Sequence, residues 1–187
     1  MKYNAIAIVG MCGSGKSVAS DMLLELGYKK VYFGGVTMEK LQEEGLEINP
    51  ENEKMMSKRL RVEHGMGAYA KILLPRIKEY TQEANTVLDG LYSWDELKIL
   101  NEELDNLVVV AIICDKEIRY ERLANREVRP FTKEQAISRD ISEIENSAKG
   151  GPIAYADYYI DNNGSIEEYQ QKLTEILEEI ERGKDEY

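Results

Sequence analysis

This sequence has little of the two residue types that most often build metal sites and crosslinks. Among its 187 residues there are two cysteines, Cys12 and Cys114, and one histidine, His64. A structural zinc site needs about four cysteine or histidine ligands in paired spacings. Two cysteines about a hundred positions apart also exclude a disulfide-stapled secreted scaffold. Any metal ion is therefore expected to be a hard cation with oxygen ligands, such as magnesium.

Long apolar runs and positive charge are also scarce. The longest apolar run covers residues 107–114, far short of the roughly 18 residues that cross a membrane. There are 24 basic and 35 acidic residues and a formal net charge of −11, which disfavours binding to duplex nucleic acid. Because the amino terminus leads directly into a strand-like run, we expect no signal peptide, a cytoplasmic location and no membrane partner.

Short apolar runs alternate with helical patterns along the chain. Strands are expected at residues 5–9, 30–33, 86–89, 107–114 and 158–160, with helices between them and a last helix that ends at Gly183. Residues 150–152, Gly-Gly-Pro, indicate a turn. Since most of the strands are apolar throughout, we predict an α/β fold with a five-stranded parallel sheet and helices on both faces. One domain over residues 1–187 is expected.

Several helix starts carry polar capping signals. Asn49 followed by Pro50 is typical of a helix start. The three pairs Ser93 with Glu96, Thr132 with Gln135, and Ser165 with Glu168 have the spacing of a capping box.

The stretch from Gly10 to Ser17 fits the phosphate-loop pattern G-x-x-x-x-G-K-[ST], after a buried strand and before a helix. Its glycines let successive backbone N–H groups face phosphate oxygens, and the helix dipole adds positive charge. Lys16 is expected to reach the β- and γ-phosphates and Ser17 to ligate Mg²⁺. We therefore predict binding of a nucleoside triphosphate. The predicted contacts are Gly10, Met11, Cys12, Gly13, Ser14, Gly15, Lys16, Ser17 and Val18.

Motifs of other phosphate-loop proteins are missing from the sequence. There is no Asn-Lys-x-Asp motif of GTPases and no Leu-Ser-Gly-Gly-Gln motif of ABC subunits. Positive charge concentrates instead between residues 119 and 139, where six basic residues accompany three acidic ones. Arginine side chains stabilise the charge that spreads over a transferred phosphoryl group. This pattern favours a kinase.

Within this stretch, Arg126 and Arg129 are the favoured catalytic arginines, because they flank a helix end where a mobile lid can cover a triphosphate. Arg122 and Arg139 are weaker candidates. Arg119 and Arg122 are also consistent with a solvated helix face, since acidic residues are interleaved with them.

A carboxylate at the end of a strand is expected near the phosphates. Asp89 precedes Gly90 and lies beside the phosphate loop if its strand neighbours the first one, where it can hold the magnesium shell or accept a proton. Asp115 also follows a strand and is the competing choice. Either residue can instead be a helix N-cap. Asp89 ranks higher because a second glycine-bearing turn follows it.

The phosphate loop, Thr86–Gly90, the arginine-rich stretch and the ending Ala156–Ser165 together resemble the nucleoside-monophosphate-kinase-like phosphate-loop kinases, which include dephospho-CoA kinase and adenylate kinase. The ending is especially similar to dephospho-CoA kinase. Residues 45–52 and 65–68 most closely resemble a largely archaeal, dephospho-CoA-kinase-like branch. The resemblance covers nearly the whole chain and is specific for the kinase group, but not for the acceptor.

The resemblance implies the strand order 2-3-1-4-5 and the cofactors ATP and Mg²⁺. By position it implies Asp89 near the magnesium ion and the catalytic arginines Arg126 and Arg129 in a lid-like segment, residues 126–139. It also implies adenine near Asn163 and Gly164. Arg122 is a weaker candidate for contact with the same nucleotide.

The sequence departs from adenylate kinases at the acceptor site. Residues 34–38 and 89–93 lack the two arginines that grip the acceptor phosphate in those enzymes. Either Arg59, Arg61 or Arg76 replaces them, or the acceptor presents no phosphate there. Two aromatic residues nearby, Tyr92 and Trp94, can stack on a ring or belong to the core.

The leading hypothesis is an ATP- and Mg²⁺-dependent kinase for a small-molecule acceptor, such as a nucleotide, a nucleoside or a dephospho-CoA-like compound. A regulatory protein that binds or hydrolyses ATP is the alternative. Residues 34–84 have the place and size of an acceptor-binding helical insertion, which favours the kinase. A nucleic-acid end kinase is disfavoured by the acidic charge. His64 is expected to be structural, or at most a contact in the acceptor site, and the oligomeric state stays open.

Overall fold

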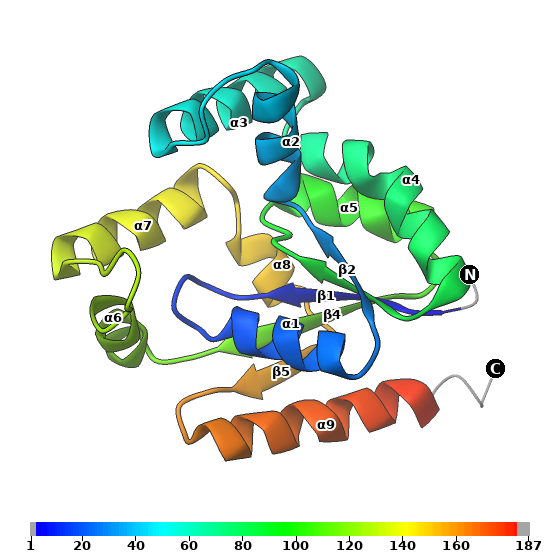
Figure 1. The fold of residues 1–187 in the computed structure, drawn as a ribbon. Helices are drawn as coiled ribbons and strands as arrows, with labels where there is room; N and C mark the ends of the chain where they lie inside the picture. Colours follow the sequence, from blue (N-terminus) through cyan, green and yellow to red (C-terminus); the bar gives the residue numbers. More distant parts are fainter. Residues whose placement is uncertain (1–2, 183–187) are drawn as a thin grey trace.

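The computed structural model describes residues 3–182, and its centre is a five-stranded parallel sheet (Figure 1). The strands lie in the order β2-β3-β1-β4-β5, and each pairs in parallel with its neighbours. Their bounds are β1 Ala5–Val9, β2 Lys29–Tyr32, β3 Thr86–Asp89, β4 Leu107–Ile113 and β5 Tyr158–Asp161. The predicted α/β class and strand order are confirmed.

Helices account for most of the remaining chain. Their bounds are α1 Lys16–Glu25, α2 Gly35–Glu43, α3 Pro50–His64, α4 Ala68–Glu83, α5 Trp94–Glu103, α6 Lys116–Ala124, α7 Lys133–Glu145, α8 Gly150–Ala154 and α9 Ile166–Arg182. No helix within residues 3–182 is both long and apolar enough to cross a membrane.

Strand β1 is buried along its whole length because helices cover both faces of the sheet. Alternate residues of a strand point to opposite faces. Accordingly Ala5, Ala7 and Val9 join the core beneath α2, α3, α4 and α5, whereas Ile6 and Ile8 join the core beneath α1 and α9. Figure 1 shows these two helical layers on opposite sides of the sheet.

The capping signals correctly predict where helices begin. The Asn49 side chain accepts a hydrogen bond from the Asn52 N–H at 2.9 Å, with Pro50 as the first residue of α3. The boxes at Ser93 and Thr132 are complete on α5 and α7. Ser165 and Glu168 also exchange two hydrogen bonds at the start of α9. Each cap satisfies backbone groups that the first helical turn leaves unpaired.

The predicted turn at residues 150–152 is wrong. Gly150, Gly151 and Pro152 lie in helix α8. Pro152 is tolerated there because the first turn of a helix needs no N–H from it. Helix α9 is described as far as Arg182. Gly183, its predicted end, lies outside the described residues.

Two groups of helices follow the carboxyl ends of the strands. Helices α2, α3 and α4 come between β2 and β3, and α6, α7 and α8 come between β4 and β5. In Figure 1, α7 lies near the loop that follows β1, and α3 lies at the top of the molecule beyond it. Ligands of parallel α/β sheets bind at this edge, where the strand order reverses beside β1.

Candidate functional site

The stretch Gly10–Ser17 runs from the end of β1 into the first turn of α1, and its three glycines adopt positive φ angles: 150° at Gly10, 83° at Gly13 and 99° at Gly15. Side chains rarely tolerate these backbone conformations. A Cβ atom at Gly13 would lie 2.8 Å from the Arg119 carbonyl oxygen, and one at Gly15 would collide with the Asn162 side chain. The glycines are therefore required by both backbone conformation and close packing.

Side chains from distant elements hold the carbonyl groups of this loop. The Asn162 side-chain amide donates to the Ser14 carbonyl at 2.8 Å, and the Tyr169 hydroxyl donates to the Gly15 carbonyl at 3.0 Å. Arg119 donates to the Cys12 carbonyl at 3.0 Å. Carbonyl groups held in this way leave N–H groups of the loop to face an anion. The sequence analysis missed Asn162 and Tyr169, although Asn162 adjoins the predicted Asn163.

Lys16 is the first residue of α1, and its ammonium group donates to the Met11 carbonyl at 2.9 Å. Burial and the positive charge of Lys149 lower the pKa of Lys16 to about 8. An ammonium group that is both desolvated and repelled by a second cation is stabilised by a bound anion. The environment of Lys16 therefore favours a polyanionic ligand.

Asp89 ends β3, in register with Ile8 of β1, at the edge of the sheet from which the phosphate loop starts. Its Oδ2 atom accepts a hydrogen bond from Ser20 at 3.3 Å and pairs with Lys30 at 2.8 Å. Ser17 and Ser20 lie three residues apart on α1 and so share a face. A hydroxyl and a carboxylate at one edge of the sheet are oxygen donors that suit Mg²⁺. The donor set therefore fits the predicted ion.

The competing residue, Asp115, forms hydrogen bonds with Asn163. It precedes α6, its backbone N–H donates to the Asn163 side chain at 2.8 Å, and its carboxylate accepts from the same side chain at 3.2 Å. Asp115 therefore ties α6 to the segment after β5. Contact with α1 beside the phosphate loop favours Asp89 over Asp115 as the carboxylate near a magnesium ion.

Arg119 is not part of a solvated helix face. Its side chain is 7% exposed, and its guanidinium forms two parallel hydrogen bonds with Asp140 of α7, at 2.8 and 2.6 Å. Tyr120 donates to the same carboxylate at 3.1 Å. The interleaved acids Glu121 and Glu127 made a solvated face plausible from the sequence. Local charge spacing could not reveal Asp140 as the partner, because Asp140 lies on another helix. The pair joins α6, α7 and the phosphate loop.

The remaining predicted nucleotide residues lie at the segment that follows β5. Arg122 donates to the carbonyl of Asn162 at 2.9 Å and therefore supports the residue that holds Ser14. Gly164 is exposed next to Asn163, after β5. These contacts bring Arg122 and the segment after β5 to the outer wall of the phosphate loop.

Arg126 and Arg129 lie in the exposed connection between α6 and α7. Arg126 lies 6.0 Å from the centre of the Phe131 ring, and Arg129 has a φ angle of 53°. Neither arginine forms an ion pair with another residue in the described range 3–182. They are available to a ligand, and no contact in this structure joins them to the loop.

Helix α7 also contacts the loop through a buried glutamate. Glu143 accepts a hydrogen bond from the Cys12 N–H at 3.0 Å and ion pairs from Lys149 and Arg139 at 2.8 and 3.1 Å. Burial raises the pKa of Glu143, but the two cations outweigh burial and lower it below its usual value. The sequence analysis identified neither Glu143 nor Lys149, because nothing near them in the sequence points to the loop.

A cleft of about 1030 Å³ separates α2 and α3 from α7. One wall holds Tyr32, Thr37, Arg61 and Tyr69, and the opposite wall holds Arg139 and Glu143, with Tyr92 contributing from the segment after β3. Glu143 touches both the cleft and the phosphate loop. The cleft therefore opens toward the loop.

The structure distinguishes the three arginines that can replace the missing pair. Arg59 bonds Glu44, with one contact at 3.0 Å, and Arg76 pairs with Glu39 at 3.1 Å, both on the surface. Arg61 lines the cleft, and its planar group lies 5.3 Å from the centre of the Tyr69 ring.

The hydrogen bonding of Arg61 is incomplete. Its Nη1 atom donates to Ser57 at 2.6 Å, but its buried Nε atom has no hydrogen-bond partner among the described residues. A buried N–H group without a partner is costly, and a bound acceptor atom removes that cost. Among the three arginines, this one is placed to bind an anion in the cleft.

Of the two aromatic candidates, only Tyr92 lines the cleft. Trp94 packs edge-to-face against Tyr155, with 5.3 Å between the ring centres, and also contacts Gly151. Trp94 therefore belongs to the core between α5 and α8.

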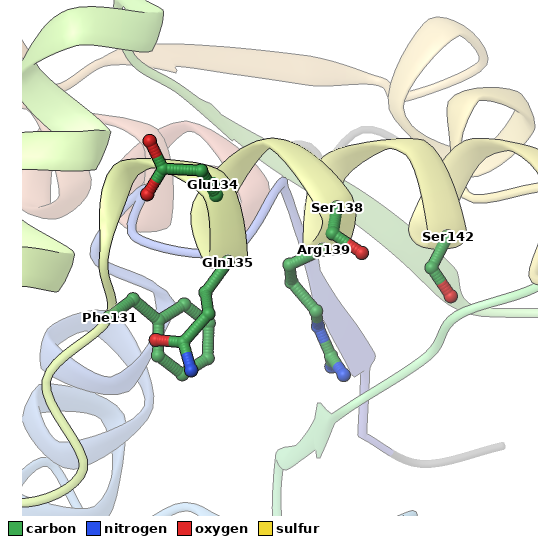
Figure 2. A pocket seen from close by; sticks show the side chains of 6 residues that line it. All are labelled: Phe131, Glu134, Gln135, Ser138, Arg139 and Ser142. Carbon is green, nitrogen blue, oxygen red and sulfur yellow. The ribbon is translucent and has the colours of Figure 1, made fainter.

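A second hollow, of about 480 Å³, lies along α7 next to the cleft. Figure 2 shows Phe131, Gln135 and Arg139 extending to the same side of this helix. Arg139 and Ser142 line both the hollow and the cleft. Helix α7 thus borders both the hollow and the cleft.

Comparisons with known proteins show the family to which this chain belongs. A family of AAA domains, AAA_18, matches residues 6–146. The UPF0200 protein of Thermococcus gammatolerans is 33% identical over 183 residues, which cover 95% of this chain and 96% of that protein. The chain belongs to the UPF0200 family. The match extends over nearly the whole length of both proteins.

Solved structures show the fold that this UPF0200 chain shares. A shikimate kinase from Acinetobacter baumannii superposes with a TM-score of 0.61 and 19% identity over 97% of this chain and 95% of that one. Dephospho-CoA kinase from Campylobacter jejuni superposes with a TM-score of 0.55 and 20% identity over 96% of this chain and 98% of that one. The UPF0200 chain therefore has the fold of phosphate-loop small-molecule kinases.

Proposed function

We propose that this protein transfers a phosphoryl group from ATP to a small-molecule acceptor, with Mg²⁺ as cofactor. The observation that carries the proposal is the position of the cleft: its α7 wall, at Glu143, also contacts the phosphate loop at Cys12. A donor triphosphate on the loop and an acceptor in the cleft then meet at one place, which is the requirement for direct transfer. We place the reaction in the cytoplasm, where the two free cysteines stay reduced.

In the proposed nucleotide site, backbone N–H groups of Gly13, Gly15, Lys16 and Ser17 bind the phosphates at the start of α1. Lys16 leaves the Met11 carbonyl and pairs with the β- and γ-phosphates. Ser17 and Asp89 would hold Mg²⁺, which neutralises the charge that develops on the phosphate oxygens. Asn163 and Gly164 are proposed to lie near the adenine, with Arg122 behind them.

We propose that residues 34–84 form the acceptor-binding part of one kinase domain spanning residues 1–187. Arg61 is placed to bind an anionic group of the acceptor through its unpartnered Nε atom. Tyr92 lines the same cleft and can contact a planar part of the acceptor. A nucleotide or a dephospho-CoA-like compound combines both features, and a nucleoside lacks the anion.

The segment of residues 126–139 is proposed to act as a lid. Arg126 and Arg129 are exposed and unpaired among the described residues, so no existing ion pair has to break when they approach a triphosphate. Movement of a few connecting residues is a common way to close a kinase site and exclude water. Arg139, on α7, already faces the cleft.

The test is a product screen. Purified protein is incubated with ATP and Mg²⁺ and with nucleosides, nucleoside monophosphates or dephospho-CoA, and mass spectrometry detects an acceptor heavier by about 80 Da, the mass that a phosphoryl group adds. Lys16→Ala and Asp89→Ala should abolish product formation. Tight ATP binding without any phosphorylated acceptor would favour an ATP-dependent regulator instead.

The role of Arg61 has a matched control. Arg61→Gln should raise the KM of an anionic acceptor about 10- to 100-fold, because a charged hydrogen bond is lost, and should leave the KM of ATP unchanged. Arg59→Gln, on the same helix but paired with Glu44 on the surface, should change neither value. An equal KM increase in both variants would refute the assignment of Arg61.

A further inference from the structure

Lys149 is a buried cation that the proposed mechanism does not yet use. It lies at the start of α8 with 1% of its surface exposed, and its ammonium group pairs with Glu143 at 2.8 Å. Its ammonium group also lies 4.7 Å from the centre of the ring of Tyr92, and Tyr92 lines the cleft. The carboxylate of Glu143 also accepts a hydrogen bond from the Cys12 N–H and therefore connects Lys149 to the phosphate loop.

Charge around this point is unbalanced. Two cations, Arg139 and Lys149, pair with the single carboxylate of Glu143, which is 3% exposed, and Lys16 of the same loop donates to the Met11 carbonyl rather than to a carboxylate. The other nearby carboxylate, Asp89, already pairs with Lys30. A buried lysine is costly unless an opposite charge is close to it. The terminal group of a triphosphate can neutralise this surplus of positive charge beside the phosphate loop, of which Lys149 is the buried part.

The position along the loop indicates which phosphate is involved. The start of α1, with Lys16 and Ser17, is the usual place for the β-phosphate. Cys12 lies four residues before Lys16, and its N–H faces α7 rather than α1. Because the cleft begins at the same α7 wall, a phosphoryl group near Cys12 lies on the acceptor side of the nucleotide.

We infer that Lys149 is a second phosphoryl-binding lysine, which contacts the γ-phosphate of ATP, and that Glu143 occupies the position of a γ-phosphate oxygen when the loop is empty. This inference rests on the proposed function. When ATP is bound, the γ-phosphate accepts the hydrogen bond of the Cys12 N–H and pairs with the Lys149 ammonium group, whereas Glu143 stays paired with Arg139. The Glu143 carboxylate thus competes with the nucleotide for two donors.

A purely structural role makes a different prediction. If Lys149 only joins α8 to α7 through Glu143, its loss weakens binding of all nucleotides together. If Lys149 binds the γ-phosphate, its loss weakens binding of a triphosphate but not of a diphosphate. The ratio of the two affinities therefore separates the roles without requiring knowledge of the acceptor.

The experiment measures binding of a non-hydrolysable ATP analogue, AMPPNP, and of ADP to the full chain by calorimetry with Mg²⁺. Lys149→Met should weaken AMPPNP binding about 10- to 100-fold and ADP binding less than about 3-fold, since one charged contact to the γ-phosphate is lost. Lys98→Met, which removes an exposed lysine paired with Asp95 on α5, is the matched control and should leave both affinities unchanged.

Glu143→Gln provides a second test with the opposite sign. The amide keeps the shape and can accept the Cys12 N–H, but it removes the competing negative charge. AMPPNP binding should therefore strengthen about 3- to 10-fold, with ADP binding little changed. This variant also decides the question if Lys149→Met does not fold.

An unchanged AMPPNP-to-ADP ratio in Glu143→Gln, or an equal weakening of both nucleotides in Lys149→Met, overturns the role of Lys149. Binding of AMPPNP to the unmodified protein is measured first. If that protein binds neither nucleotide, the proposed function fails together with this inference. If it binds both and the ratios do not move, only the inference about Lys149 fails.

Discussion

The buried pair between Arg119 and Asp140 should be among the most costly single contacts to break in this protein. Arg119 makes three hydrogen bonds, two to Asp140 and one to the Cys12 carbonyl, and Asp140 accepts a further one from Tyr120. Asp140→Leu leaves a guanidinium that is 7% exposed without its counter-charge. Removing one partner of a buried pair costs about 3–5 kcal/mol.

That loss is large for a domain of this size. Total stability is typically about 5–15 kcal/mol, and 1 kcal/mol shifts the melting temperature by about 2–4 °C in this size range. Asp140→Leu should therefore lower the melting temperature by about 6–20 °C. Since the pair holds α7 against the phosphate loop, ATP affinity should fall as well.

A double-mutant cycle isolates the contribution of the pair. Arg119→Met combined with Asp140→Leu removes both charges. The free energy of unfolding that the double variant loses should be about 2–3 kcal/mol smaller than the sum of the losses in the two single variants. Chemical denaturation measures each free energy of unfolding. Additivity of the single losses within about 0.5 kcal/mol would refute the interpretation that the cost comes from a stranded charge.

The pH dependence of the same variants offers an internal check. Burial opposes ionisation of Asp140, but the hydrogen bonds and charge of Arg119 outweigh it and lower the pKa of Asp140. The stabilisation is therefore present above the ordinary aspartate pKa and is lost as the pH falls through the lowered value. The stability difference between the wild type and Arg119→Met should shrink over that acidic range.

Two further predictions concern the loop. Gly15 has a φ angle of 99° and an added Cβ atom would collide with Asn162, so Gly15→Ala should weaken ATP binding at least about 10-fold and lower stability by about 1–3 kcal/mol. The control Gly27→Ala, at φ 86° with no atom within 4 Å of the added Cβ, should lower stability less and leave ATP binding unchanged. Equal effects of the two variants in calorimetry would contradict this reasoning. Burial and the charge of Lys149 lower the pKa of Lys16 to about 8, and a bound triphosphate should raise this pKa. ATP binding should therefore take up a proton near pH 8 and weaken as the pH rises above that value. Identical binding heats in buffers of different ionisation enthalpy would contradict this proton uptake.

Local patterns in the sequence are sufficient to predict most elements of this fold. Each of the five strands is an apolar or β-rich run, and each capping box is complete within four residues, so no distant partner is needed to recognise them. The error at Gly150–Pro152 has the same origin. Two glycines and a proline predict a turn locally, but packing of Gly151 against Trp94 and of Pro152 in the first turn supports a short helix.

The sequence by itself determined the phosphate loop, because that motif is contiguous and its glycines, lysine and serine each have a local physical reason. Only the tertiary structure decided which charged residues surround it. Glu143 lies 131 positions from Cys12, and Asn162 lies 148 positions from Ser14. The folded topology alone decides that Arg61 lines the cleft, that Arg119 is buried and that Lys149 pairs with Glu143 beside the loop, because partners so far apart leave no periodic signal along the chain.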